Sequence, residues 1–199
     1  SGTTSNGASG TISMSTGAST HGSGGSMYIT VGKSKTDYGG DAYTLAGDSA
    51  VTTGGSISLA TGESTHTSTG SIIVKTMNAG VSGVSGQLSF TSGTTSSGTS
   101  GALKFYSNDA TGGKAGNVLF TVGNTQSNEV GGNAVMIAGD QTDTTGGALL
   151  LSAGFGVNPG TVKIVTPNGG VSGVSGDLTF FSGTTSNGAS GTISMSTGA

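Results

Sequence analysis

The sequence contains no cysteine, no tryptophan and no arginine, and only two prolines in 199 residues. Without cysteine there are no disulfides and no thiolate metal sites. Charged residues make up 8% of the chain, all six basic residues are lysines, and the net charge is −3. Nucleic-acid binding requires a basic stripe that displaces counterions, so we expect no nucleic-acid partner. No run approaches the roughly 18 apolar residues of a membrane span.

Recognisable processing signals are also missing. No asparagine stands in an Asn-x-Ser/Thr context, whereas serine and threonine are abundant, so we expect O-linked glycans as the sugar attachment, if any. No secretory leader begins the chain. Because the last eighteen residues are identical to the first eighteen, we expect an excerpt from a longer protein. The missing leader then says little about secretion.

What the sequence does have is repetition. The 41 glycines would ordinarily indicate a flexible linker. However, SGTTSNGASGTISMSTGA forms both the first and the last eighteen residues, 181 residues apart. GVSGVSG starts at Gly80 and again at Gly170, 90 residues later. The sequence therefore predicts a unit over 1–181 built from two sub-repeats of about 90 residues, with the next unit beginning at 182.

A finer repeat lies inside these units. An apolar-x-apolar pattern recurs thirteen times, from Ile12/Met14 to Ile193/Met195, in steps of 13 to 17 residues. A period of two is typical of strands, and the glycines on either side indicate turns. One or two residues after ten of the pairs stands a small residue or valine, as a tight corner requires; these are Thr16, Val31, Ala46, Thr61, Thr76, Ser92, Ser107, Val122, Ala138 and Ala153.

These patterns predict an all-β fold without helices. Antiparallel hairpins would give two alternating kinds of strand end, whereas the turn chemistry here is nearly the same after every pair. We therefore expect a parallel β-solenoid (β-helix) of about 13 coils with roughly 15 residues each, continuous over 1–199. Phe90, Phe105 and Phe120 would form an inward aromatic ladder. No cap is visible at either end, so another copy could supply the missing end-to-end pairing.

Candidates for chemistry are few. Asp48 and Asp140 each end an AGD motif and precede TTGG, which suits either turn aspartates or a weak calcium site. His21 and His66 lie in Ser/Thr/Gly-rich segments and are expected to be solvated. We therefore predict no enzyme activity, no catalytic residues and no cofactor.

The outward positions between the paired apolar residues carry a second signal. Most are polar, but Tyr28, Ile73, Leu119, Met136 and Leu150 are not. Either another segment of the same chain covers these side chains, or they make lateral contacts with another filament or subunit.

In its repeat style the chain resembles the Gly/Ser/Thr-rich β-solenoid repeat proteins of extracellular fibres, adhesins and algal or microbial surface appendages. The resemblance implies a structural segment, located outside the cell or on its surface, that gives stiffness and assembles with copies of itself. The alternative is an ice-binding β-solenoid, although regular outward Thr-x-Thr pairs are missing. A polysaccharide-processing β-helix would need longer coils and clustered acidic or basic residues, and neither is visible.

Overall fold

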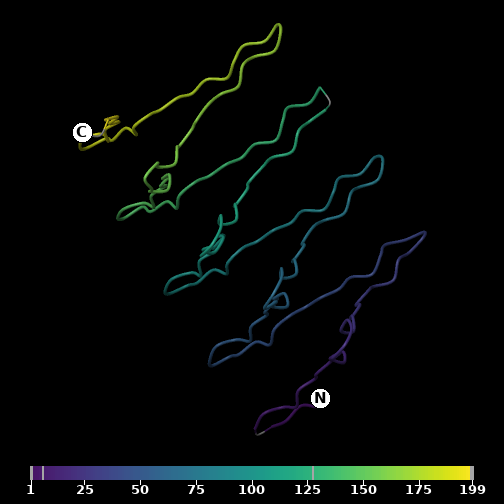
Figure 1. Cartoon of the computed structure of the whole chain (residues 1–199). Helices are drawn as coiled ribbons and strands as arrows, with labels where there is room; N and C mark the ends of the chain where they lie inside the picture. Colours follow the sequence, from purple (N-terminus) through teal and green to yellow (C-terminus); the bar gives the residue numbers. More distant parts are fainter. Residues whose placement is uncertain (1, 6, 127, 198–199) are drawn as a thin grey trace. The chain divides into compact units, whose positions relative to one another are not determined.

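The computed structural model describes residues 2–5, 7–126 and 128–197. Within these ranges the chain forms no helix and no strand, and it reverses direction repeatedly through bends and turns (Figure 1). The predicted parallel β-solenoid of about 13 coils is therefore wrong. Period-two alternation favours an extended backbone, but a strand also requires a neighbouring segment in hydrogen-bonding register. The described segments do not pair in this way.

The chain divides into two compact units, Ser1–Leu103 and Lys104–Ala199. This boundary does not coincide with the sub-repeat marks at Gly80 and Gly170. The outermost residues of the duplicated text, Ser1 and Ala199, lie outside the described residues. No helix in the described part of the chain is long and apolar enough to cross a membrane.

Short loops are the recurring local structure. Backbone hydrogen bonds close several of them: the amide of Gly55 donates to the carbonyl of Gly47 at 2.8 Å, that of Gly147 to Gly139 at 2.8 Å, and that of Gly160 to Gly154 at 3.0 Å. Side chains close others: the Thr16 hydroxyl donates to the Gly25 carbonyl at 3.0 Å. The Ser/Thr/Gly-rich segments are loops whose two limbs meet at the mouth.

We call the pair of residues at each mouth a neck. The first residue of a neck is small or a valine, and the second is a glycine. A Cβ atom added to that glycine would contact the side chain of the first residue or the backbone of the residue that follows it. At Gly55 and Gly147 that atom would lie 3.2 Å from a backbone nitrogen, so only glycine fits without a shift. The necks are Thr16/Gly25, Val31/Gly40, Ala46/Gly55, Thr61/Gly70, Thr76/Gly86, Ser92/Gly101, Ser107/Gly116, Val122/Gly132, Ala138/Gly147, Ala153/Gly160, Thr166/Gly176 and Ser182/Gly191.

Three residues after the neck residue, a polar side chain often turns back onto the loop. The Ser34 hydroxyl accepts from the amide of Asp37, that of Ser49 from Thr52, and that of Ser64 from Thr67, each at 3.0 Å. Ser and Thr favour such turns because their hydroxyl groups replace a missing backbone partner. The loops are thus held locally and need no distant segment.

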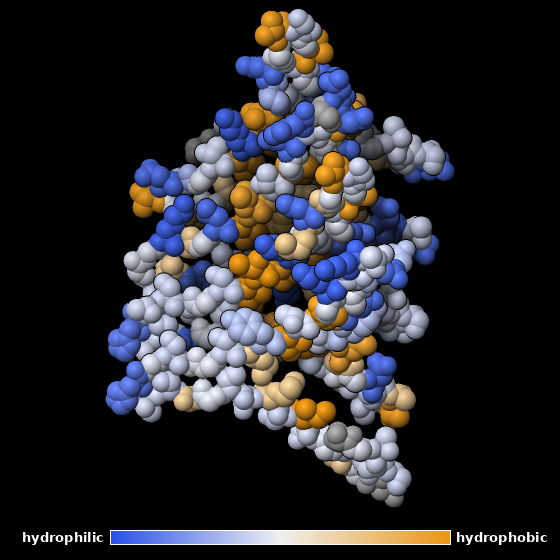
Figure 2. Space-filling view, turned by 90° about the vertical axis from the view of Figure 1, so that its right-hand side faces the viewer, coloured by the Kyte–Doolittle hydropathy of each residue, from blue (hydrophilic) through white to orange (hydrophobic). Residues whose placement is uncertain are grey.

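No residue in the described ranges is buried, and no apolar core exists there. The five half-buried residues lie at necks or in loops; they are Ala46, Ser64, Ala138, Ala153 and Gly156. The alternation nevertheless leaves a trace, because Leu149, Leu150 and Leu151 are 54%, 86% and 60% exposed. Hydrophobic side chains remain open to view on the face shown in Figure 2.

Candidate functional site

Lys104–Ala199 holds two aromatic rings in contact. The rings of Phe105 and Phe120 meet edge to face, with centroids 6.2 Å apart and planes at 89°. Both side chains stay largely exposed, as does Phe90 in the other unit. Two residues of the expected ladder are therefore in contact, but they line no interior of the single chain.

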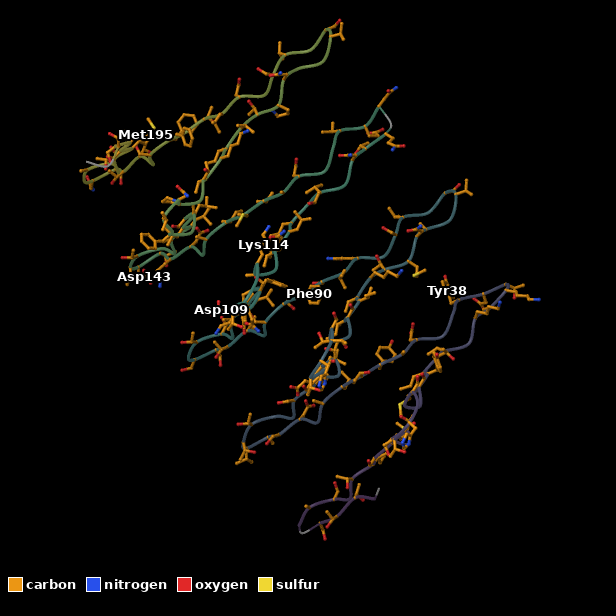
Figure 3. The ribbon with its side chains drawn as sticks, viewed as in Figure 1. Tyr38, Phe90, Asp109, Lys114, Asp143 and Met195 are labelled. Atoms are coloured by element: carbon orange, nitrogen blue, oxygen red, sulfur yellow. The ribbon has the colours of Figure 1, made fainter. Side chains whose placement is uncertain are left out.

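A large hollow lies in the same unit. Residues between Ser107 and Leu119 form one wall, and Ser152, Gly154 and Gly160 form the other; its volume is about 1250 Å³. Ser107 and Gly116 form one neck, and Gly160 is the glycine of the neck Ala153/Gly160, three steps further along the chain. The hollow therefore lies between two loops of the repeat. Lys114, labelled in Figure 3, supplies the single charge of the lining.

A smaller hollow of about 360 Å³ continues the apolar character of this unit. Phe120, Ala134, Val135 and Met136 line it. Phe120 thus contacts Phe105 and also contributes to an apolar recess. This combination of exposed apolar side chains and open recesses suits the capture of another apolar surface.

The predicted lateral-contact residues fall into two groups. Leu119 lines the larger hollow and Met136 the smaller one. Tyr28, Ile73 and Leu150 line neither of these two hollows and are largely exposed. All five side chains are largely exposed in the structure.

The two calcium candidates lie at loop mouths. Asp48 follows Gly47 and Asp140 follows Gly139, the glycines whose carbonyls accept the loop-closing hydrogen bonds. Both side chains are exposed. No group of three or more His, Cys, Asp or Glu residues in the described ranges could hold a metal ion. Each aspartate stands just before the bends of its loop.

The two histidines interact with the residues next to them in sequence. His21 and His66 contact the hydroxyls of Thr20 at 3.1 Å and Thr65 at 2.7 Å, and both are exposed. In Figure 3, Tyr38 and Asp143 lie on loops that project from the adjoining segments of the same chain. No nucleophile, base and orienting acid come together among the contacts described, so these contacts do not form a catalytic arrangement.

Sequence reasoning missed the necks and the hollows. The signal for the necks is present, because a glycine follows most corner residues by nine positions and a Ser or Thr often follows by three. The hollows have no such signal, since they depend on how segments 45 residues apart are spaced.

No family model, no curated protein and no solved structure matches this chain. The resemblance to repeat proteins of surface fibres therefore remains a prediction.

Proposed function

We propose that this chain is a structural repeat segment of a long fibre or filament, located outside the cell or on its surface. Its task is to give length and stiffness and to assemble laterally or end to end with copies of itself. The observation that supports this most is the exposure of every large hydrophobic side chain in the described residues. A chain with this much uncovered apolar surface gains free energy by covering it with more protein.

The surface area supports the same conclusion. The chain exposes 20013 Å² at a mass of 18.8 kDa. A folded monomer of this mass exposes about 8,300 Å², and its unfolded chain about 27,000 Å². The difference from a folded monomer is several times the roughly 1,200–2,000 Å² that a standard protein interface buries. Assembly can therefore supply the burial that the single chain does not have.

The low charge fits this role. Few like charges are brought together when copies align, because only 8% of the residues are charged. No observation favours the ice-binding alternative, since a regular ice-binding face needs flat, paired strands.

Sedimentation velocity and negative-stain microscopy of the purified chain, over a concentration series, test the proposal. We expect elongated assemblies whose fraction rises with concentration. A monomer at all concentrations, or compact particles of fixed size, would overturn it. A thermal-hysteresis measurement on the same sample checks the ice-binding alternative, and we expect no activity.

A further inference from the structure

The loop over 183–191 places a carboxamide side chain directly before a glycine. Its bends include Asn187 and Gly188, and Asn187 is exposed. We propose that Asn187 is a site of spontaneous covalent modification, at which the Gly188 nitrogen attacks the side-chain amide and a carboxylate replaces it. The structure favours this reaction at Asn187 over the same reaction at Asn168. The inference does not rest on the proposed function.

The reaction consumes only water and releases ammonia. The Gly188 nitrogen forms a bond to the side-chain carbonyl carbon of Asn187, and the carboxamide nitrogen leaves as ammonia with the proton that the Gly188 nitrogen gives up. Water then opens the cyclic imide at either of its carbonyl carbons. The product is aspartate, or isoaspartate, in which the main chain runs through the former side-chain carbon. No oxidant or reductant is needed, and the chain gains a negative charge.

Glycine at position 188 leaves this attack unobstructed. A side chain there would crowd the nitrogen, whereas glycine reaches the wide range of backbone dihedral angles through which the ring closes. Gly188 has φ +146°, and a Cβ atom added to it would lie 3.7 Å from its neighbour, the Thr185 hydroxyl. The backbone hydrogen bonds of the described residues do not engage the Gly188 amide. The attack therefore breaks no backbone hydrogen bond in the described chain.

A loop of the same form elsewhere in the chain lacks the reactive side chain. Ser97 and Gly98 hold the equivalent places 90 residues earlier. Gly98 also has a positive φ, +115°, with the Thr95 hydroxyl 3.9 Å from its Cβ position. Both glycines therefore adopt the left-handed region, whichever residue precedes them. Serine has no side-chain carbonyl, so the loop over 93–101 is an unreactive counterpart within the same chain.

Asn168 also precedes a glycine, but this pair is held in a tight turn. A Cβ atom on Gly169 would lie 2.8 Å from both the Gly173 carbonyl oxygen and the Val174 carbonyl carbon, so two stretches of backbone pass very close to each other. The Gly173 amide also donates to the Gly170 carbonyl at 3.1 Å and closes the turn. Rotation of the peptide after Asn168 into the ring-closing geometry requires this turn to open. Asn168 should therefore react more slowly.

Incubation of the purified chain tests the site, because peptide mass spectrometry reads the gain in mass at each asparagine separately. We expect conversion at Asn187 to run about tenfold faster than at Asn168, which corresponds to about 1.4 kcal/mol of activation free energy. The rate at Asn187 should rise with pH, since the attacking nitrogen must lose its proton. Equal rates at the two positions, no conversion at Asn187, or a rate that does not rise with pH would overturn the proposal.

Two controls separate the loop structure from the local sequence. Asn187→Ser should abolish conversion at position 187 and keep the loop, because the equivalent loop already carries serine at position 97. Ammonia release that Asn187→Ser leaves undiminished would contradict the site. In concentrated urea, which opens the turn at Asn168 without any substitution, the rates at Asn168 and Asn187 should become equal. A difference that persists in urea would show that the neighbouring residues set the rates, and the structural argument would fail.

Discussion

The amide of Gly147 donates a hydrogen bond to the carbonyl oxygen of Gly139 at 2.8 Å and closes a loop of seven intervening residues. The same bond joins Gly55 to Gly47 at 2.8 Å, in the other unit. A Cβ atom at position 147 would lie 3.2 Å from the Gly139 nitrogen and 3.5 Å from the Ala138 methyl. Closure of this loop therefore favours a residue without a side chain at position 147.

Gly147→Ala should open this loop. The added methyl meets backbone atoms that cannot move without lengthening the hydrogen bond, which is worth about 0.5–1.5 kcal/mol. We expect hydrogen exchange of the amide at position 147 to accelerate about tenfold, which corresponds to about 1.4 kcal/mol. Gly112→Ala is the matched control, because nothing lies within 4 Å of its Cβ position. Equal exchange rates in both variants would show that the neck has no steric requirement for glycine.

Gly98→Ala should strain a loop through its backbone alone. Gly98 has φ +115°, a conformation that residues with a side chain rarely adopt. An added Cβ atom would have room, since its nearest neighbour would be the Thr95 hydroxyl at 3.9 Å. The expected cost is about 1–2 kcal/mol. Gly93→Ala, in the same loop and without a positive φ, should cost much less. Nuclear magnetic resonance shifts of the loop residues would report a conformational change only in the first variant.

Ser64→Ala should loosen the loop that contains His66. The Ser64 hydroxyl accepts from the Thr67 amide and also contacts the Thr67 hydroxyl, both at 3.0 Å. Loss of this turn hydrogen bond should cost about 1 kcal/mol and speed exchange of the Thr67 amide. Ser58→Ala, outside the loop, serves as the control. Unchanged exchange at Thr67 would mean that the backbone alone holds the turn.

The Phe105–Phe120 contact should appear as a coupling energy. Edge-to-face pairs contribute about 0.5–1.5 kcal/mol beyond burial. A double-mutant cycle with alanine at both positions, measured by chemical unfolding of the assembled chain, should return a coupling in this range. The pairing of Phe120 with the fully exposed Phe155 should return a coupling near zero. Equal couplings would indicate that the edge-to-face contact is not maintained in the assembly.

Calcium removal should leave assembly unchanged. Calcium takes about six to eight oxygen ligands. Asp48 and Asp140 are exposed loop residues, and the described ranges bring no three acidic or histidine side chains together. We expect the assembled fraction to be the same with a chelator, with calcium, and in an Asp48→Asn, Asp140→Asn variant. A calcium-dependent rise that the double variant lacks would restore the calcium interpretation.

Some local features follow from the sequence because they depend on neighbouring residues alone. Small corner residues such as Ala46 and Ala138 do lie at tight places, and glycines do mark loop limbs. The sequence did not indicate the partner of each corner residue, which is a glycine across the loop mouth. Spacing within one segment can be read from the sequence, whereas the contacts between segments cannot.

The sequence by itself determined the 15-residue step, the places of the glycines and the two-sided character still seen at Leu149, Leu150 and Leu151. Only the tertiary structure decided that the described segments form no strands with one another and that hollows remain between them. The physical reason is that alternation fixes which side chains share a face. Burial and backbone pairing depend on which segment lies beside that face, and here the chain alone does not supply it.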